Sequence, residues 1–208
     1  MTRAVLFIFF LLAALCQTGT ALSADPAAGE TALHAAARSG DIETVRSLLE
    51  KGSPVDVRTK HLETPLLLAA ANGHAKTVSL LIDKLAGIDI TDYEGRTPLI
   101  VAAQNSHLET VVILLDNGAN PNANMGSGES PMIFAVKNGR LEIMKALYEM
   151  GANLSTLNKD GESPLSIARK QGNKDVIAFL EKNNARIPPP PTGEKPNDSP
   201  SHGKEAKE

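Results

Sequence analysis

The chain is poor in aromatic rings and nearly free of cysteine. Its 208 residues include no tryptophan, 3% aromatic residues and one cysteine, Cys16. A single cysteine excludes an internal disulfide and a metal site built from several thiolates. The scarcity of large rings favours a core that short stacked helices fill with Leu, Ile, Val and Ala.

A basic excess is also lacking. The formal net charge is −3, from 21 Lys and Arg against 24 Asp and Glu. Nucleic-acid-binding domains carry a strong basic excess or a basic stripe, because they must neutralise phosphates. We therefore expect no nucleic acid among the partners.

Motifs of catalysis are missing as well. The sequence has no phosphate-binding Gly loop, no His-Glu-x-x-His and no Gly-x-Ser-x-Gly. His74 and His107 lie at equivalent positions, which helix packing places roughly 10 Å apart, too far to share a metal. We predict that both are structural, that the chain is not an enzyme, and that it binds neither cofactor nor metal. A cation held by clustered acidic loop residues is the basis of the alternative, enzymatic hypothesis.

Residues 1–24 have the pattern of a secretory signal peptide. Arg3 precedes an unbroken apolar run of twelve residues, Ala4 to Leu15. This run is too short to span a bilayer, so we expect no stable membrane anchor. Cys16 falls inside the signal, and a mature chain without thiols fits an oxidising compartment. Small residues offer three cleavage positions, after Ala21, Ser23 or Ala24.

A four-residue pattern of Thr or Ser, Pro or Ala, an apolar residue and a variable residue recurs every 33 residues. Its copies begin at Thr31, Thr64, Thr97, Ser130 and Ser163. Five copies in phase predict an all-α solenoid of five stacked helix–turn–helix units. The predicted repeat domain covers 25–185, with units near 29–58, 59–91, 92–124, 125–157 and 158–185.

The third unit illustrates the local signals. Thr97 is a good N-cap, and Pro98 at the first helical position loses no hydrogen bond. A short helix to Gln104 and a second helix over 107–116 follow, and Gly118 is a left-handed C-cap. Gly95 supplies the positive φ that the preceding turn needs.

The repeated residues resemble the ankyrin repeat. The resemblance rests on Thr-Pro-Leu at Thr64 and Thr97, alanine pairs such as Ala102-Ala103, the Gly-Ala-Asn runs at 118–120 and 151–153, and a leucine kept in all five units. That leucine is Leu48, Leu81, Leu114, Leu147 and Leu180. The resemblance implies antiparallel helix pairs stacked side by side, with hairpin loops projecting at right angles.

Some units depart from the family pattern. The family's His survives only as His34, for which the resemblance implies a structural role. The second unit has Leu62 and Leu85 where glycine is expected, so we expect its loop to differ locally. Polar Arg169 and Glu181 in the fifth unit predict a terminal cap, and five capped units look complete. Residues 186–208 are rich in Pro, Lys and Glu and predict a disordered tail.

Ankyrin proteins bind partners through loop tips and the concave face of the first helices, and this resemblance assigns the candidate site. The solvated-surface alternative is that these polar side chains only keep the solenoid soluble. The candidate partner-binding residues are Lys60, His61, Glu63, Tyr93, Glu94, Arg96 and Glu129 on the loops, and Asn72, Asn105 and Lys137 on the helix ends.

We therefore predict a monomeric, non-catalytic protein–protein interaction module that holds or protects a partner protein outside the cytoplasm. The alternative is an immunity-type inhibitor of a toxin or enzyme in the periplasm. The layout is similar to small periplasmic or secreted ankyrin proteins of Gram-negative bacteria, with a eukaryotic secreted origin as the second hypothesis.

Overall fold

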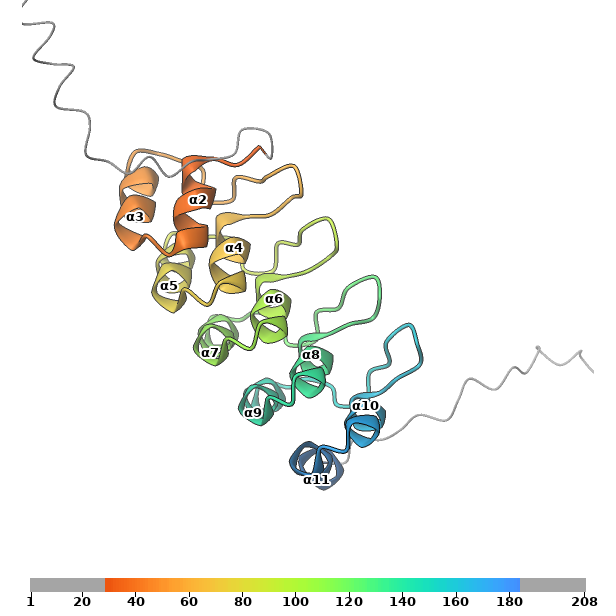
Figure 1. Ribbon diagram of the computed structural model, residues 1–208. Coiled ribbons are helices and arrows are strands. Elements are labelled where there is room, and N and C mark those ends of the chain that lie inside the picture. The colour runs from red at the N-terminus through yellow and green to blue at the C-terminus, as the bar shows by residue number, and fades with distance from the viewer. Residues whose placement is uncertain (1–28, 184–208) are drawn as a thin grey trace, which may run out of the picture.

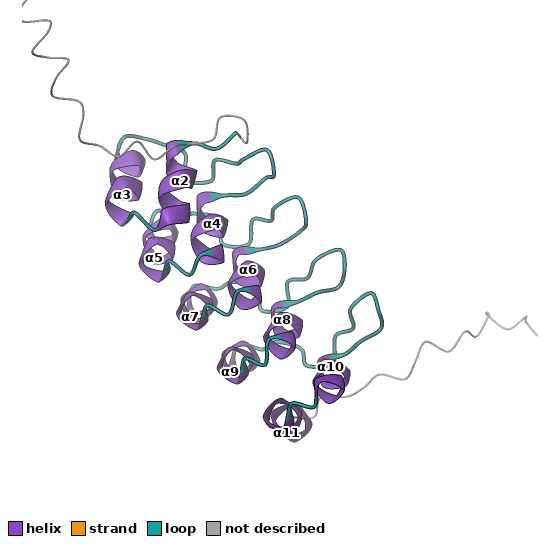
Figure 2. Cartoon of the chain, viewed as in Figure 1, coloured by secondary structure: helices purple, strands orange, loops and turns teal. Residues whose placement is uncertain are grey.

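The computed structural model describes residues 29–183, which form a row of ten helices (Figure 1). The predicted signal peptide, 1–24, and the predicted tail, 186–208, lie outside the described residues. Figure 2 shows helices and loops but no strand over 29–183, so the predicted all-α fold is confirmed. The helices are α2 (Ala32–Ser39), α3 (Ile42–Glu50), α4 (Pro65–Ala71), α5 (Ala75–Asp83), α6 (Pro98–Gln104), α7 (Leu108–Asp116), α8 (Pro131–Lys137), α9 (Leu141–Glu149), α10 (Pro164–Gln171) and α11 (Lys174–Lys182).

In units two to five, the hydroxyl group of a threonine or serine caps the N-terminus of the first helix. The Thr97 hydroxyl accepts a hydrogen bond from the backbone N–H of Ile100 at 3.2 Å, and Pro98 follows at the first helical position. Because the proline N has no hydrogen, the helix starts without an unpaired donor there. An equivalent capping hydrogen bond is found at the N-termini of α4, α8 and α10.

The helices form two parallel layers, with the hairpin loops projecting to one side (Figure 1). First helices α2, α4, α6, α8 and α10 contact one another in sequence, and α3, α5, α7 and α9 do the same. Fully buried alanine pairs, such as Ala102 and Ala103, allow the close approach of neighbouring first helices. The repeated leucine is fully buried in units two to five, whereas Leu48 in the end unit is only partly covered.

Histidines join consecutive units at the turn between the two helices. Nε2 of His74 lies 2.9 Å from the carbonyl oxygen of Arg38, and Nε2 of His107 lies 3.1 Å from that of Ala71. Each ring also stacks over a glycine of the preceding unit: a Cβ on Gly73 would lie 2.5 Å from the His107 ring. The prediction that these histidines are structural is confirmed.

His34 has a similar structural role in the first hairpin. Its ring is fully buried, and its Nδ1 accepts the backbone N–H of Thr31 at 3.1 Å. Nε2 therefore carries the proton and donates to the carbonyl oxygens of Val57, at 2.9 Å, and Glu63, at 3.2 Å.

The second unit keeps the backbone conformation of its neighbours, so the expected local difference was wrong. Leu62 has φ +61°, where the third unit has Gly95 at +80°, and Leu85 has φ +64°, where the third unit has Gly118 at +89°. The hydrogen bonds of the turn are also the same, for example from the N–H of Leu62 to the carbonyl of Thr59 at 3.0 Å. The stacked hairpins on either side impose the turn, and the leucines adopt a left-handed backbone that costs about 1 kcal/mol each.

The fifth unit ends the row with polar groups, as predicted for a cap. Arg169 on α10 pairs with Glu181 on α11 at 2.7 Å, and both side chains are about half exposed. This pair lies where inner units have apolar residues or Tyr148, which lets the last unit face water without an apolar face.

Candidate functional site

An oxygen atom inside three of the hairpins holds the tip in shape. Oδ1 of Asp92 accepts the backbone N–H groups of Glu94 and Arg96, both at 2.9 Å. The Asn158 amide and the Thr59 hydroxyl do the same at the equivalent positions of the fifth and second units. The loop-tip side chains of these units are therefore displayed from rigid turns.

The second and third hairpins meet through His61 and Tyr93. The Tyr93 N–H donates to the carbonyl oxygen of His61 at 3.1 Å, and the two rings lie 5.6 Å apart at an angle of 47°. The Tyr93 side chain remains 62% exposed. Its hydroxyl donates to Glu94 at 2.9 Å, and this bond to a carboxylate raises the pKa of Tyr93 above its usual value.

Leu62 lies at the tip beside His61, and sequence reasoning did not include it among the site residues. It is 42% exposed although it is a large apolar residue in a strained left-handed conformation. We name His61, Leu62 and Tyr93 the hairpin patch. Its signal in the sequence was the leucine at a position where the four other units have glycine, which indicated a loop variant rather than a binding residue.

Three other predicted residues of these hairpins are engaged within the structure. Nε of Arg96 lies 2.7 Å from Asp92 and 3.2 Å from Glu94, so its charge is balanced inside its own hairpin. Glu63 accepts the hydroxyl hydrogen of Thr59 at 3.1 Å. Lys60 is exposed at the tip of the second hairpin, next to Gly29 of the first unit.

The structure brings the predicted residues Glu129 and Lys137 together. Nζ of Lys137, at the end of α8, lies 2.7 Å from Oε1 of Glu129 in the fourth hairpin, so the two side chains form an ion pair. The first and fifth units have the same pair eight residues apart, Glu30 with Arg38 and Glu162 with Lys170. Lys170 holds the pKa of Glu162 below its usual value, with help from Asn158. Three units therefore brace the hairpin against the first helix with a salt bridge.

The second and third units lack this brace and have an uncharged surface there. Eight residues after Glu63 stands Ala71, and eight after Arg96 stands Gln104. We name the exposed or half-exposed ends of α4 and α6 the central face; it comprises Ala71, Asn72, Gln104 and Asn105. By equivalence with the braced units, the central face lies next to the hairpins that bear the hairpin patch.

The two predicted asparagines of the central face each donate a hydrogen bond to backbone. Nδ2 of Asn105 donates to the carbonyl of Ala71 in the preceding unit at 2.7 Å, and Nδ2 of Asn72 donates to Leu68 at 2.8 Å. Asn138 and Gln171 repeat the cross-unit bond in the next two units. These amides hold the helix ends in register while their side-chain oxygens stay available.

The described residues contain no group of three or more His, Cys, Asp or Glu side chains with the geometry of a metal site. None of the helices between residues 29 and 183 is long and apolar enough to cross a membrane. The surface so assembled is one of uncharged helix ends beside rigid hairpins with an exposed ring and leucine.

Comparison with known proteins agrees with this arrangement. The family model described as "Ankyrin repeats (3 copies)" matches residues 33–125 and 120–189, which is more than half of the chain. No curated protein matches the chain. Ankyrin repeats are protein–protein interaction modules, so a protein partner is indicated. The chain belongs to the ankyrin-repeat family.

Proposed function

We propose that this protein is a non-catalytic adaptor or protective partner outside the cytoplasm, and that it holds another protein against the hairpin patch and the central face. The observation that carries the proposal is the exposed Leu62, held in a strained backbone next to His61, whose ring packs on the exposed Tyr93. Backbone strain persists where the surroundings demand it, and it is found at binding surfaces more often than elsewhere.

The chemistry of the surface fits a protein ligand. Tyrosine is enriched at interface hot spots because it buries a large rigid area and still offers a hydroxyl. Since the central face carries no charged side chain, a partner can cover it without desolvating an ion. The braced units on either side supply a polar, charged rim, as protein interfaces usually have.

Co-purification from cells tests the surface. We expect Tyr93→Ala with Leu62→Ala to reduce affinity for the main partner at least about 30-fold, corresponding to roughly 2 kcal/mol for a hot spot. The matched control is Leu85→Ala, because Leu85 is also an exposed left-handed leucine of the second unit but lies at the end of α5. Undiminished recovery with the double variant would exclude the assigned surface. A partner that is a toxin or an enzyme silenced in the complex would make the role that of an inhibitor.

The location is supported by the pattern of residues 1–24 and by the absence of cysteine after Cys16. When the full chain is expressed in a Gram-negative host, we expect the periplasmic fraction to contain a form shortened after Ala21, Ser23 or Ala24. Mass spectrometry reads the cleavage site. Leu11→Arg with Leu12→Arg interrupts the apolar run and should leave the full-length chain in the cytoplasm; an unshortened wild-type chain there would contradict the proposal.

A further inference from the structure

The fourth hairpin differs from the second, third and fifth in the residue at the start of its turn. In those three hairpins an oxygen-bearing side chain accepts two backbone N–H groups of the turn, at distances from 2.9 to 3.2 Å. The side chains are those of Thr59, Asp92 and Asn158. The fourth hairpin has Met125 at this position, and a thioether is only a weak acceptor.

The backbone of the fourth turn is nonetheless that of its neighbours. The N–H of Met125 donates to the carbonyl of Glu129 at 2.9 Å, and the N–H of Gly128 donates to that of Met125 at 2.8 Å. The third turn has the same two bonds, both at 3.1 Å. The N–H groups of Ser127 and Glu129 correspond to the pair accepted by a side chain in the other turns, but they have no acceptor among residues 29–183. One oxygen atom on the side chain of residue 125 would therefore pair both.

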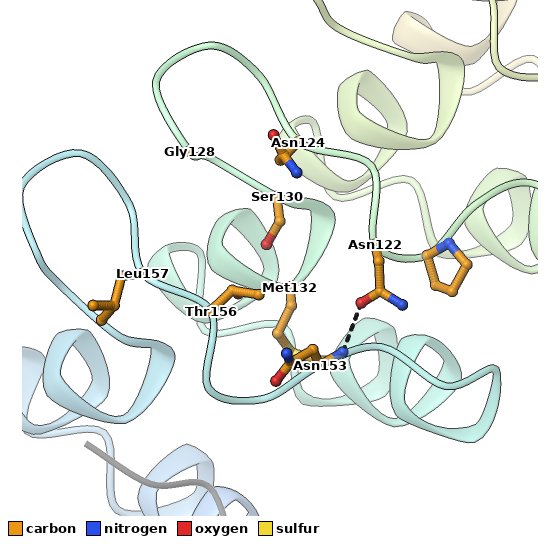
Figure 3. A pocket seen from close by; sticks show the side chains of 9 residues that line it. Asn122, Asn124, Gly128, Ser130, Met132, Asn153, Thr156 and Leu157 are labelled. Atoms are coloured by element: carbon orange, nitrogen blue, oxygen red, sulfur yellow. Dashed lines mark hydrogen bonds between the residues drawn. The ribbon is translucent and has the colours of Figure 1, made fainter. Parts of the chain in front are cut away.

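The fourth turn also has open space beside it. Figure 3 shows the hairpin running from Asn124 round to Gly128, and both residues line a pocket of about 210 Å³ between the fourth and fifth hairpins. The side of the turn that faces the fifth unit is therefore not closely packed. The turn can adjust to a side chain that gains one atom, at a lower cost than a closely packed core would impose.

The four methionines of residues 29–183 differ in their access to solvent. Met132 and Met144 are fully buried, whereas Met125 is partly exposed and Met150 is 46% exposed. Oxidation of a thioether requires that the oxidant reaches the sulfur, so Met125 and Met150 are the two that a dissolved oxidant attacks. The backbone N–H groups of Met150 and of the two residues after it are all paired. Met150 is therefore a comparison site without a missing acceptor.

We propose that Met125 is a site of reversible oxidation, and that its sulfoxide oxygen supplies the acceptor that the fourth turn lacks. The oxidant is a peroxide. The sulfur attacks one peroxide oxygen, and the O–O bond breaks as the S–O bond forms. With hydrogen peroxide, the proton of the transferred hydroxyl passes to the departing hydroxide, which leaves as water. The sulfur is oxidised by two electrons and the peroxide is reduced by two.

The sulfoxide oxygen can reach the two N–H groups. It is one bond further from the backbone than the carboxylate oxygen of Asp92, and the three rotatable bonds of the methionine side chain allow it to fold back over the turn. Oxidation of a methionine in an apolar core disrupts packing. At Met125 it has the opposite effect, because it pairs two donors and holds the fourth tip as the other tips are held. This inference goes beyond the proposed function, since it involves no partner protein.

The test is treatment of the purified protein with hydrogen peroxide, with mass spectrometry to locate the added oxygen. Amide hydrogen exchange at Ser127 and Glu129 should then slow at least about fivefold, which is the effect of gaining one hydrogen bond. The urea concentration at the midpoint of unfolding should rise by about 0.5 M. Methionine sulfoxide reductases for the two epimers should reverse both changes. Unchanged or faster exchange after oxidation of Met125 would overturn the proposal.

Three variants complete the test. Met150→Leu should respond to peroxide as the wild type does, whereas Met125→Leu should show neither change; equal responses in these two variants would overturn the proposal. Met125→Gln carries its oxygen the same number of bonds from the backbone as the sulfoxide does, so it should slow the exchange without oxidant. If Met125→Gln slows the exchange and peroxide does not, the oxidised sulfur does not place its oxygen in the turn and the assignment fails.

Discussion

At the scale of single residues, the choice of amino acid is most restricted where one unit packs against the next. Gly73 has φ +72° and no room for a Cβ beneath the His107 ring. Ser106 occupies the equivalent position in the third unit with φ +65°, and the next unit there has Arg140 in place of histidine. Nε of Arg140 donates to the Ser106 hydroxyl at 3.0 Å. The glycine is therefore needed where a flat ring lies over it.

Gly73→Ala should destabilise the protein more than Gly172→Ala does. Both positions have a positive φ, which costs about 1 kcal/mol for alanine. The Cβ at Gly172 meets nothing within 4 Å, whereas at Gly73 it displaces the His107 ring from its bond to Ala71. We expect a loss of roughly 1 kcal/mol for Gly172→Ala and about 2–3 kcal/mol for Gly73→Ala, read from urea unfolding. Equal losses would show that the ring moves aside freely.

The ionisation of Tyr93 reports on the hairpin patch. Its hydrogen bond to Glu94, and then the negative charge of Glu94, raise the pKa of Tyr93 above its usual value near 10. Because the folded-state pKa is the higher one, this contribution to stability is complete below pH 10 and is lost as the pH rises through the folded pKa. Absorbance titration at 295 nm should show the late phenol transition disappear in Tyr93→Phe and move to lower pH in Glu94→Gln. An unmoved transition in Glu94→Gln would contradict the bond.

At the scale of the element, the hairpin depends on one buried acceptor that its own sequence provides. Oδ1 of Asp92 satisfies two backbone N–H groups, and its other oxygen holds Arg96 at 2.7 Å. The fourth hairpin has Met125 instead, so its turn keeps the backbone bonds, such as Met125 N–H to the carbonyl of Glu129 at 2.9 Å, without a side-chain acceptor inside the turn. The fourth hairpin therefore lacks the side-chain acceptor that holds the tips of the second, third and fifth hairpins.

Met125→Asn should stabilise the protein. The amide oxygen would accept the N–H groups of Ser127 and Glu129, as Asn158 does for the fifth hairpin. We expect a gain of about 1 kcal/mol in the free energy of unfolding. Met125→Leu is the control, since it replaces the thioether without adding an acceptor and should change stability little. A similar gain from leucine would attribute the effect to burial rather than to hydrogen bonding.

At the scale of the whole molecule, each unit is covered only by its neighbours. Tyr148 on α9 meets Phe179 on α11 edge to face at 5.8 Å, and α10 packs on α8. Stability in such an array is close to a sum of unit and interface contributions, so the polar outer face of the fifth unit protects the units before it.

Ending the chain at Leu157 should destabilise the fourth unit beyond the loss of the fifth. Removal of α10 and α11 exposes the apolar faces of α8 and α9, which have no polar cap of their own. We expect a lower unfolding temperature and binding of a hydrophobic dye, measured against the full chain. Arg169→Leu with Glu181→Leu tests the cap separately, because it keeps α10 and α11 but makes the outer face apolar; a shortened chain that stays as stable as the full one would refute the capping role.

Much of the fold followed from residues that act over short separations. Thr97, Pro98 and Gly118 predicted where helices begin and end, because caps and turns are settled by hydrogen bonds spanning three to five residues. The turn around Leu62 was mispredicted, since the sequence shows the cost of a left-handed leucine but not the stacked hairpins that enforce it. Among the candidate site residues, Asn105 depends on the carbonyl of Ala71, which only the fold brings near, whereas Arg96 pairs with Asp92 and Glu94 of its own hairpin.

The sequence by itself determined the 33-residue unit and the capped helices, because these repeat in phase and depend on hydrogen bonds between near neighbours. The alanine pairs and the histidines also recur in phase, although their contacts, such as that of His107 Nε2 with the carbonyl oxygen of Ala71, cross from one unit to the next. Only the tertiary structure decided which surface is uncharged and where His61 meets Tyr93. Contacts between units join residues about 33 positions apart, so they become visible only when the units stack and substitutions in one face those in the next.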